Sequence, residues 1–196
     1  WTQVPASLDL PAEVVFEVQS RPLDEQLRYA ISQTRLVTDN YWREALKEGK
    51  TLSPVGEAFV LQFGDGPDLL LLPRSQAVCR AILEHDSIPL QDRATAIRRL
   101  GEITNQPPGE ILLDVIHQHA KENSAAFNNL LPLLNALSDE ELQGLKPQLV
   151  KIVTQDGNSG LRSAAIAALI ELGESADKLF EMASVNDRGT VAYLNS

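Results

Sequence analysis

The chain has 196 residues, a length that suits one domain or one stretch of a longer array. Its 27 acidic and 17 basic residues give a formal net charge of -10, which argues against a general DNA- or RNA-binding surface, because such a surface needs clustered positive charge. The longest apolar runs, Ala164–Ile170 and Leu69–Leu72, are far shorter than the about 20 residues that cross a bilayer. The single cysteine, Cys79, excludes an internal disulfide, a cysteine-based zinc cluster and a CxxCH haem attachment. Because the chain opens at Trp1 with no initiator Met and no signal peptide, we expect a mature or excised piece.

In the first half of the chain, apolar spacing of three and four predicts helices. Val14–Phe16 fits a strand or a short helix equally well. Asp24 is expected to cap a helix with an inward stripe: Leu27, Ala30, Ile31, Thr34, Val37 and Tyr41. Residues 51–74 are the least regular stretch, and we expect one helix around Gly56–Gln62 and a turn at Gly64–Pro67.

In the second half, Ser75 and Asp92 are expected to start helices, and a further helix follows Pro107–Gly109. Phe127–Leu137 predicts a helix that Pro132 bends, because proline removes a hydrogen bond and crowds the preceding turn.

Ser138–Glu141 has the pattern of a capping box. It should begin a short helix that Gly144 and Pro147 interrupt before Gln148–Thr154. The last clear stripe ends at Gly173, a residue type that accepts left-handed dihedrals after a helix.

Two of these segments resemble each other. Asp92–Gly101 and Leu161–Leu169 each place an Arg at the helix start, an Ala three residues later and a Leu seven residues later. Asp24–Ile31 matches more loosely. The intervals between the segments exceed one repeat, so each needs an extra helix pair or an insertion. The sequence therefore predicts an all-α chain, an irregular α-solenoid of stacked antiparallel helix pairs.

The two better segments resemble the second helix of a HEAT repeat, whose pattern is an Asp turn followed by V/L-R-x-x-A-x-x-A-L-G. Arg21–Thr34 is further similar to the RPLDxxLRYALxQT stretch of large haem-binding, membrane-bound dehydrogenase-like proteins of planctomycetes, as are Trp42–Leu46 and Leu72–Val78. In that family a sugar-dehydrogenase-like propeller precedes HEAT repeats and a cytochrome c domain. The resemblance implies that this chain corresponds to the HEAT portion, without haem ligation or dehydrogenation of its own.

We expect one α-solenoid segment over residues 1–196. It divides into a first helical unit at 1–50, an irregular insertion at 51–74, HEAT-like repeats at 75–183 and a C-terminal tail at 184–196.

No residue pattern predicts a catalytic or metal site. His117 and His119 are two residues apart and so point to different sides of a helix. His85 stands at a helix end, where a histidine interacts favourably with the helix dipole. Asp156–Gly160 resembles the start of a calcium loop, but position six is Leu161 instead of Gly and position twelve is Ala167 instead of Glu. We therefore expect no cofactor, bound metal or catalytic turnover.

Three apolar or aromatic residues have a structural interpretation first. Cys79 shares the inward stripe of its helix and is interpreted as a small core residue, not a nucleophile. Tyr41 and Trp42 end an amphipathic helix and are expected to cover the core where the array is interrupted.

The predicted surface candidates are three arginines at equivalent repeat positions and the turn carboxylates expected to pair with them. These residues are Arg28, Arg93, Arg162, Asp24, Asp92 and Asp156. Such a ladder would stabilise stacking, although each exposed pair is worth only ~0.5 kcal/mol. A phosphate-binding strip is the alternative, and the acidic balance, which grows after Leu100, counts against it.

We expect a non-catalytic scaffold or docking module that contacts a protein partner or neighbouring domains of the same chain, with no nucleic acid and no membrane insertion. The resemblance implies a larger exported, periplasmic, haem-containing redox protein. Two alternatives stay open. One is an enzyme on a HEAT-like fold, of the bilin lyase or DNA glycosylase type, and the other is a stand-alone cytoplasmic scaffold.

Overall fold

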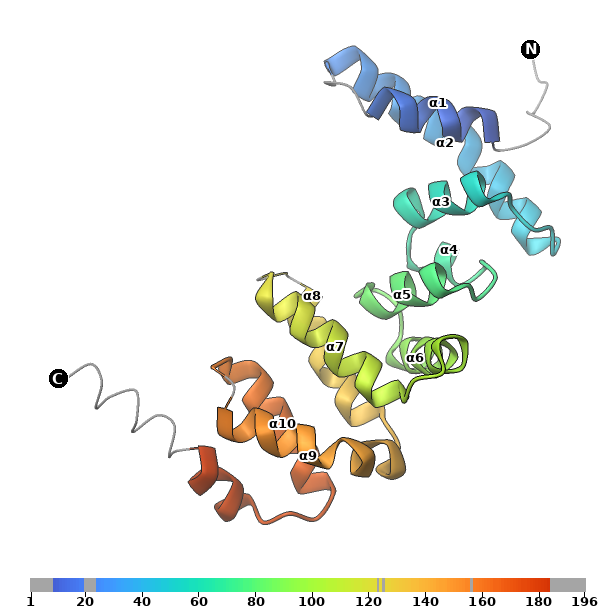
Figure 1. Cartoon of the computed structure of the whole chain (residues 1–196). Helices are drawn as coiled ribbons and strands as arrows, with labels where there is room; N and C mark the ends of the chain where they lie inside the picture. Colours follow the sequence, from blue (N-terminus) through green and yellow to red (C-terminus); the bar gives the residue numbers. More distant parts are fainter. Residues whose placement is uncertain (1–8, 20–23, 123, 125, 156, 184–196) are drawn as a thin grey trace. The chain divides into compact units, whose positions relative to one another are not determined.

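The computed structural model describes residues 9–19, 24–122, 124, 126–155 and 157–183 (Figure 1). Every regular element in these ranges is a helix, which confirms the predicted all-α class. The chain divides into two compact units, Trp1–Ala81 and Ile82–Ser196. Each unit is described by itself, and the expected tail at 184–196 lies outside the described residues.

The first unit contains α1 (Asp9–Gln19), α2 (Glu25–Lys47), α3 (Pro54–Phe63), α4 (Gly66–Leu69) and most of α5 (Gln76–Glu84). Helix α1 packs on α2 and α3, and α3 packs on α4. Val14–Phe16 lies in α1, so the helix prevails over the strand. Three aromatic rings join α1 to α3, because Phe59 lies 6.2 Å from Phe16 and 4.8 Å from Phe63 between ring centroids.

Local hydrogen bonds set the helix ends of this unit. Asp24 caps α2, because its Oδ1 accepts from the Leu27 amide at 2.8 Å. Gly49 ends that helix with a φ of +75°, a conformation that favours glycine. Ser75 accepts from the Val78 amide at 3.2 Å and caps α5. The caps predicted at Asp24 and Ser75 are confirmed.

Two expectations for the first unit need correction. The predicted helix around Gly56–Gln62 lies within α3, but the expected turn at Gly64–Pro67 also begins a second helix, α4, which Asp65 caps. Val37, placed on the inward stripe of α2, is 72% exposed. Thr38, Trp42 and Leu46 make the buried face instead.

The second unit contains α6 (Leu90–Thr104), α7 (Pro108–Lys121), α8 (Ala126–Leu130), the 3-10 helix η1 (Leu131–Ala136), α9 (Asp139–Gln155) and α10 (Ser159–Glu171) (Figure 1). Residues 176–183 are also helical. Helix η1 contacts both α6 and α10, whereas α7 contacts α9. Further contacts join α6 to α7, α7 to α8 and η1, and α9 to α10.

Two helix ends of the second unit lie where the sequence predicted them. Ser138 and Glu141 form the predicted capping box, with the Ser138 amide donating to Glu141 Oε2 at 2.7 Å and the Glu141 amide donating to Ser138 Oγ at 3.3 Å. Gly173 has a φ of +86°, and the amide of Glu174 donates to the Leu169 carbonyl at 3.0 Å. This pairing satisfies a carbonyl at the end of α10.

Prolines act differently from expectation. Pro132 does not bend one continuous α-helix: α8 ends at Leu130, and Pro132 is the second residue of the 3-10 helix η1 that follows. Pro147 does not interrupt α9, which runs unbroken through Gly144 and Pro147. The helix continues because Pro147 is exposed and five apolar side chains of α9 are buried: Leu142, Leu145, Leu149, Ile152 and Val153. The burial of each contributes about 1.5–3 kcal/mol, which together offsets a proline cost of about 3 kcal/mol.

Small residues allow close approach in this unit. Ala96, Ala165 and Ala168 are at most 1% exposed. Gly109 at the start of α7 is buried, and a Cβ added there would lie 2.6 Å from Leu145 Cδ1. The glycine therefore lets α7 approach α9.

Candidate functional site

The candidate functional site is a groove of about 580 Å³ between α7 and α9 of the second unit. It is lined from α7 by Glu110, Leu113, Asp114 and His117, and from α9 by Gln148, Lys151, Ile152 and Gln155. In both helices the lining residues stand at i, i+3, i+4 and i+7, so each helix contributes one face over two turns. The groove is thus a direct consequence of helical periodicity on two neighbouring helices.

The floor of the groove is apolar and its rims are charged. Leu113 is 4% exposed and Ile152 is 5% exposed, so both pack into the unit. Glu110 and Asp114, one turn apart on α7, are exposed, as is Lys151 on α9. None of these three charged side chains forms an ion pair with another described residue. The groove therefore presents two carboxylates on one wall and an ammonium group on the other.

Gln148 contributes an amide to the α9 wall. Its Oε1 is buried and has no hydrogen-bond partner among the described residues. A buried acceptor of this kind carries a cost of about 1–3 kcal/mol, which a nearby N–H donor would relieve. Gln155, two turns further along α9, is exposed at the same groove.

The three histidines have different surroundings. His117 is half-buried at the groove, whereas His119 is largely buried, with a side chain 13% exposed and its Nε2 3.6 Å from Glu84 Oε1. His85 follows the end of α5, where its Nδ1 lies 3.1 Å from Ser87 Oγ. In the described part of the chain no three His, Cys, Asp or Glu residues gather in a way that could hold a metal ion.

The predicted surface candidates are not brought together as a ladder of ion pairs among the described residues. Arg28 is exposed, and its expected partner Asp24 accepts from the Leu27 amide. Arg162 is half-buried on α10, while Asp156 lies outside the described residues. Asp92 lies in the first turn of α6, which begins at Leu90, so it does not cap that helix as expected.

Arg93 requires the clearest correction. It was expected on the surface beside Asp92, but it is 3% exposed. Its Nε donates to the Leu83 carbonyl at 2.8 Å and its Nη2 donates to the Asn129 carbonyl at 2.9 Å. Burial lowers the pKa of Arg93, only partly opposed by the charge of Asp86. Arg93 therefore ties α6 to the ends of α5 and α8 as a core residue.

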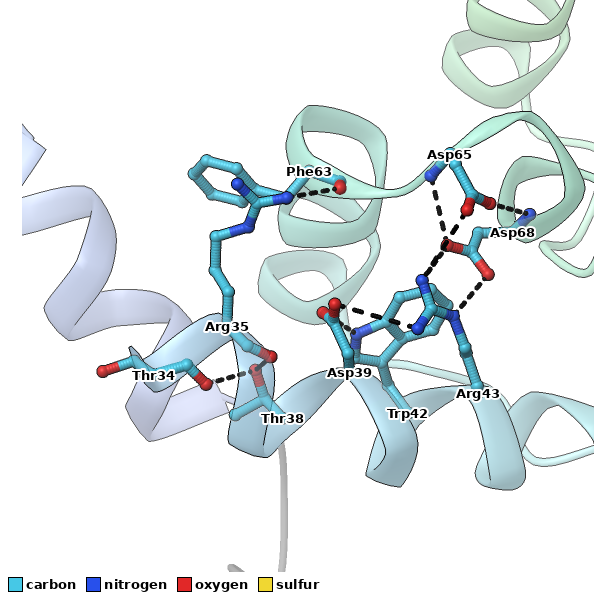
Figure 2. A network of polar contacts seen from close by, with 9 residues as sticks. All are labelled: Thr34, Arg35, Thr38, Asp39, Trp42, Arg43, Phe63, Asp65 and Asp68. Atoms are coloured by element: carbon cyan, nitrogen blue, oxygen red, sulfur yellow. Dashed lines mark hydrogen bonds and ion pairs between the residues drawn. The ribbon is translucent and has the colours of Figure 1, made fainter. Parts of the chain in front are cut away.

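Sequence reasoning missed a second polar centre, in the first unit. Figure 2 shows Arg43 of α2 reaching the start of α4, where its Nε and Nη2 each donate to a carboxylate oxygen of Asp68 at 2.7 Å. Asp68 is 4% exposed and also accepts from the Asp65 amide at 3.1 Å. The D-G-P-D spacing of a capped, proline-initiated turn was the available signal for α4, although it does not name Arg43 as a partner.

Arg43 and Asp68 each stabilise the ionised form of the other. Hydrogen bonding to Asp68 raises the pKa of Arg43, outweighing the opposing effect of burial. Burial alone would raise the pKa of Asp68, but the hydrogen bonds from Arg43 and Asp65 outweigh it and lower that pKa. The pair is a structural ion pair, since both charges are already satisfied by protein groups.

The same network extends along α2. Arg35 donates from Nη2 to the Phe63 carbonyl at 3.0 Å and stacks 4.7 Å from the centre of the Phe63 ring (Figure 2). Trp42 is 1% exposed, and its Nε1 donates to Asp39 at 3.3 Å. The core role expected of Trp42 agrees with this burial. Cys79, also interpreted as a core residue, is fully buried.

Among the described residues, no helix has the length and apolar character needed to cross a membrane. No family model matches the chain, and no curated protein and no solved structure shows significant similarity to it.

Proposed function

We propose that the chain is a non-catalytic helical-repeat scaffold of the HEAT type that docks a protein partner or a neighbouring domain. The observation that carries the proposal is the groove between α7 and α9, which has an apolar floor and charged rims whose side chains form no ion pair with another described residue. Stacked helix pairs leave surfaces of this form on one side of the stack, and repeat proteins use them for binding.

The contacts of the second unit support a repeat arrangement. Helices α6, η1 and α10 make one row, because η1 contacts both of the others, and α7 and α9 make a second row. The two segments that resemble HEAT second helices belong to α6 and α10 and therefore to the same row. The interval between Arg93 and Arg162 is longer than one repeat, and helices α8 and η1, which lie between α6 and α10 in the sequence, account for the additional length.

By the resemblance of Arg21–Thr34, we further propose that the scaffold belongs to a larger exported, haem-containing redox protein. Sequencing the gene around this segment tests that part. A signal peptide, a propeller pattern and a CxxCH motif in the same reading frame are expected. A flanking sequence with none of these would leave a stand-alone scaffold.

Docking is tested by placing a photo-crosslinking amino acid at Gln155, on the groove, and at Ser163, an exposed position of α10 outside it. In the full-length protein we expect position 155 to yield crosslinks to one defined partner segment that excess unlabelled chain competes away. Position 163 is the matched control and should not yield them. Crosslinks that are equal at both positions, or absent at 155, would contradict docking through this groove.

A further inference from the structure

Resting on the proposed docking function, we propose that the α7–α9 groove holds an extended peptide segment that presents one arginine or lysine side chain to Glu110 and Asp114. The inference concerns the chemistry of the partner and goes beyond the existence of a docking surface.

The length and the lining of the groove favour a short extended segment. Each wall spans seven residue steps of α-helix, which is about 10 Å at 1.5 Å per residue. An extended peptide advances about 3.3 Å per residue, so about three residues lie along the groove. A helix pairs its own backbone N–H and C=O groups, whereas an extended segment leaves these groups free to bond with the side-chain amides of Gln148 and Gln155.

The charges of the α7 wall favour a cation. Glu110 and Asp114 face the groove one turn apart, and neither carboxylate has an ion-pair partner among the described residues. The buried side chain of Leu113, which lies between them in sequence, forms part of the apolar floor beside the two carboxylates. A guanidinium or ammonium group placed there would make charge-assisted hydrogen bonds, and a guanidinium could meet a carboxylate through two parallel bonds.

The α9 wall limits the bound peptide to a single basic side chain in the groove. Lys151 stands on the opposite side of the groove and would repel a second basic side chain. Gln148 and Gln155 supply amides that can both donate to and accept from a peptide backbone. Turning the Gln148 carboxamide toward a backbone N–H of the peptide gains a hydrogen bond that its Oε1 does not make with any described residue.

The experiment uses the whole 196-residue chain and an array of six-residue peptides with one central position fixed as Arg, Lys, Glu or Ala. The best peptide is then measured in solution by fluorescence polarisation against two double variants. Glu110→Gln with Asp114→Gln removes the proposed contacts. Glu140→Gln with Glu171→Gln makes the same change of charge at exposed positions outside the groove and is the matched control.

We expect selection of Arg and Lys peptides, binding at least tenfold weaker to the groove variant, near-unchanged binding to the control variant, and weaker binding at higher salt. Methyl signals of Leu113 and Ile152 should shift on binding. Equal loss in both variants would reduce the effect to general charge and overturn the proposal. Selection of Glu or Ala peptides, or no binding, would also overturn it. The crosslinking experiment would still test the docking function independently of such a result.

Discussion

Arg43 and Asp68 stand 25 residues apart in the sequence and meet through two parallel hydrogen bonds of 2.7 Å each. The planar guanidinium of Arg43 matches the two oxygens of the carboxylate, a geometry that lysine cannot reproduce. The contact joins the last two turns of α2 to the first turn of α4, next to the buried Trp42 ring, which Arg43 also covers at 4.8 Å.

We predict that Asp68→Ala lowers the free energy of unfolding of the first unit by about 2–3 kcal/mol, because it removes two charge-assisted hydrogen bonds from a buried site. Denaturant unfolding followed by Trp42 fluorescence, in a Trp1→Phe background that leaves one tryptophan, measures the loss. Glu44→Ala removes an exposed carboxylate from α2 and should change stability by less than about 0.5 kcal/mol. Equal effects of the two substitutions would show that the pair does not stabilise the unit.

We also predict a dependence on acid pH that passes through Asp68. Its pKa in the folded chain is lowered, so the stabilisation is complete above the unfolded-state value of about 3.9 and is lost as pH falls through the folded pKa. The same Trp42 signal, measured in wild type and Asp68→Asn between pH 7 and pH 2, should show a smaller loss in the variant. Glu141 and Glu174 of the second unit also have lowered pKa values, so the difference between the two proteins is the informative quantity. Parallel pH profiles would contradict the prediction.

For the second unit, Arg93→Met is expected to cost about 2–4 kcal/mol, because the substitution leaves the Leu83 and Asn129 carbonyls without their donor. Chemical denaturation followed by circular dichroism measures the change. Arg99→Met is the matched control: Arg99 is exposed and pairs with Glu102 at 2.6 Å, and the loss there should stay below about 1 kcal/mol. A cost at position 93 no larger than that of the control would contradict a stabilising role for the two hydrogen bonds of Arg93.

Packing of α10 gives a further pair of matched substitutions. Ala165 is fully buried and Ala167 is exposed two residues along the same helix. Ala165→Leu should destabilise the chain by about 1–3 kcal/mol through overpacking, and Ala96→Leu in α6 should do the same, whereas Ala167→Leu should be near neutral. Thermal melts compare the three variants. If Ala165→Leu melted like Ala167→Leu, the helix row of α6, η1 and α10 would be wrongly assigned.

Two glycines should respond to alanine with opposite sign. Gly173 has a φ of +86° after α10, so Gly173→Ala introduces strain and should destabilise by about 1 kcal/mol or more. Gly144 is exposed inside α9, and a Cβ added there meets nothing within 4 Å. Gly144→Ala should stabilise by about 0.5–1 kcal/mol. Differential scanning calorimetry on both variants checks the two signs, and any shared sign would count against this account of α9 and α10.

Much of the local structure was determined by sequence alone. The caps at Asp24, Ser75 and Ser138, the end of α10 at Gly173 and the all-helical class could be predicted, because each depends on groups within about four residues of one another. Apolar periodicity likewise placed Cys79 in the core.

Tertiary structure decided the rest. Whether Pro147 breaks α9, whether Arg93 lies inside or outside, and whether Arg43 meets Asp68 all depend on partners that packing brings near from 10 or more residues away. The α7–α9 groove is of the same kind. Helical spacing assigns Asp114 to one face of α7 and Lys151 to one face of α9, but only the packing of the two helices makes those faces the walls of one groove. The physical reason is that a side chain's own helix sets its direction, while its burial and its partners are set by whichever element lies opposite.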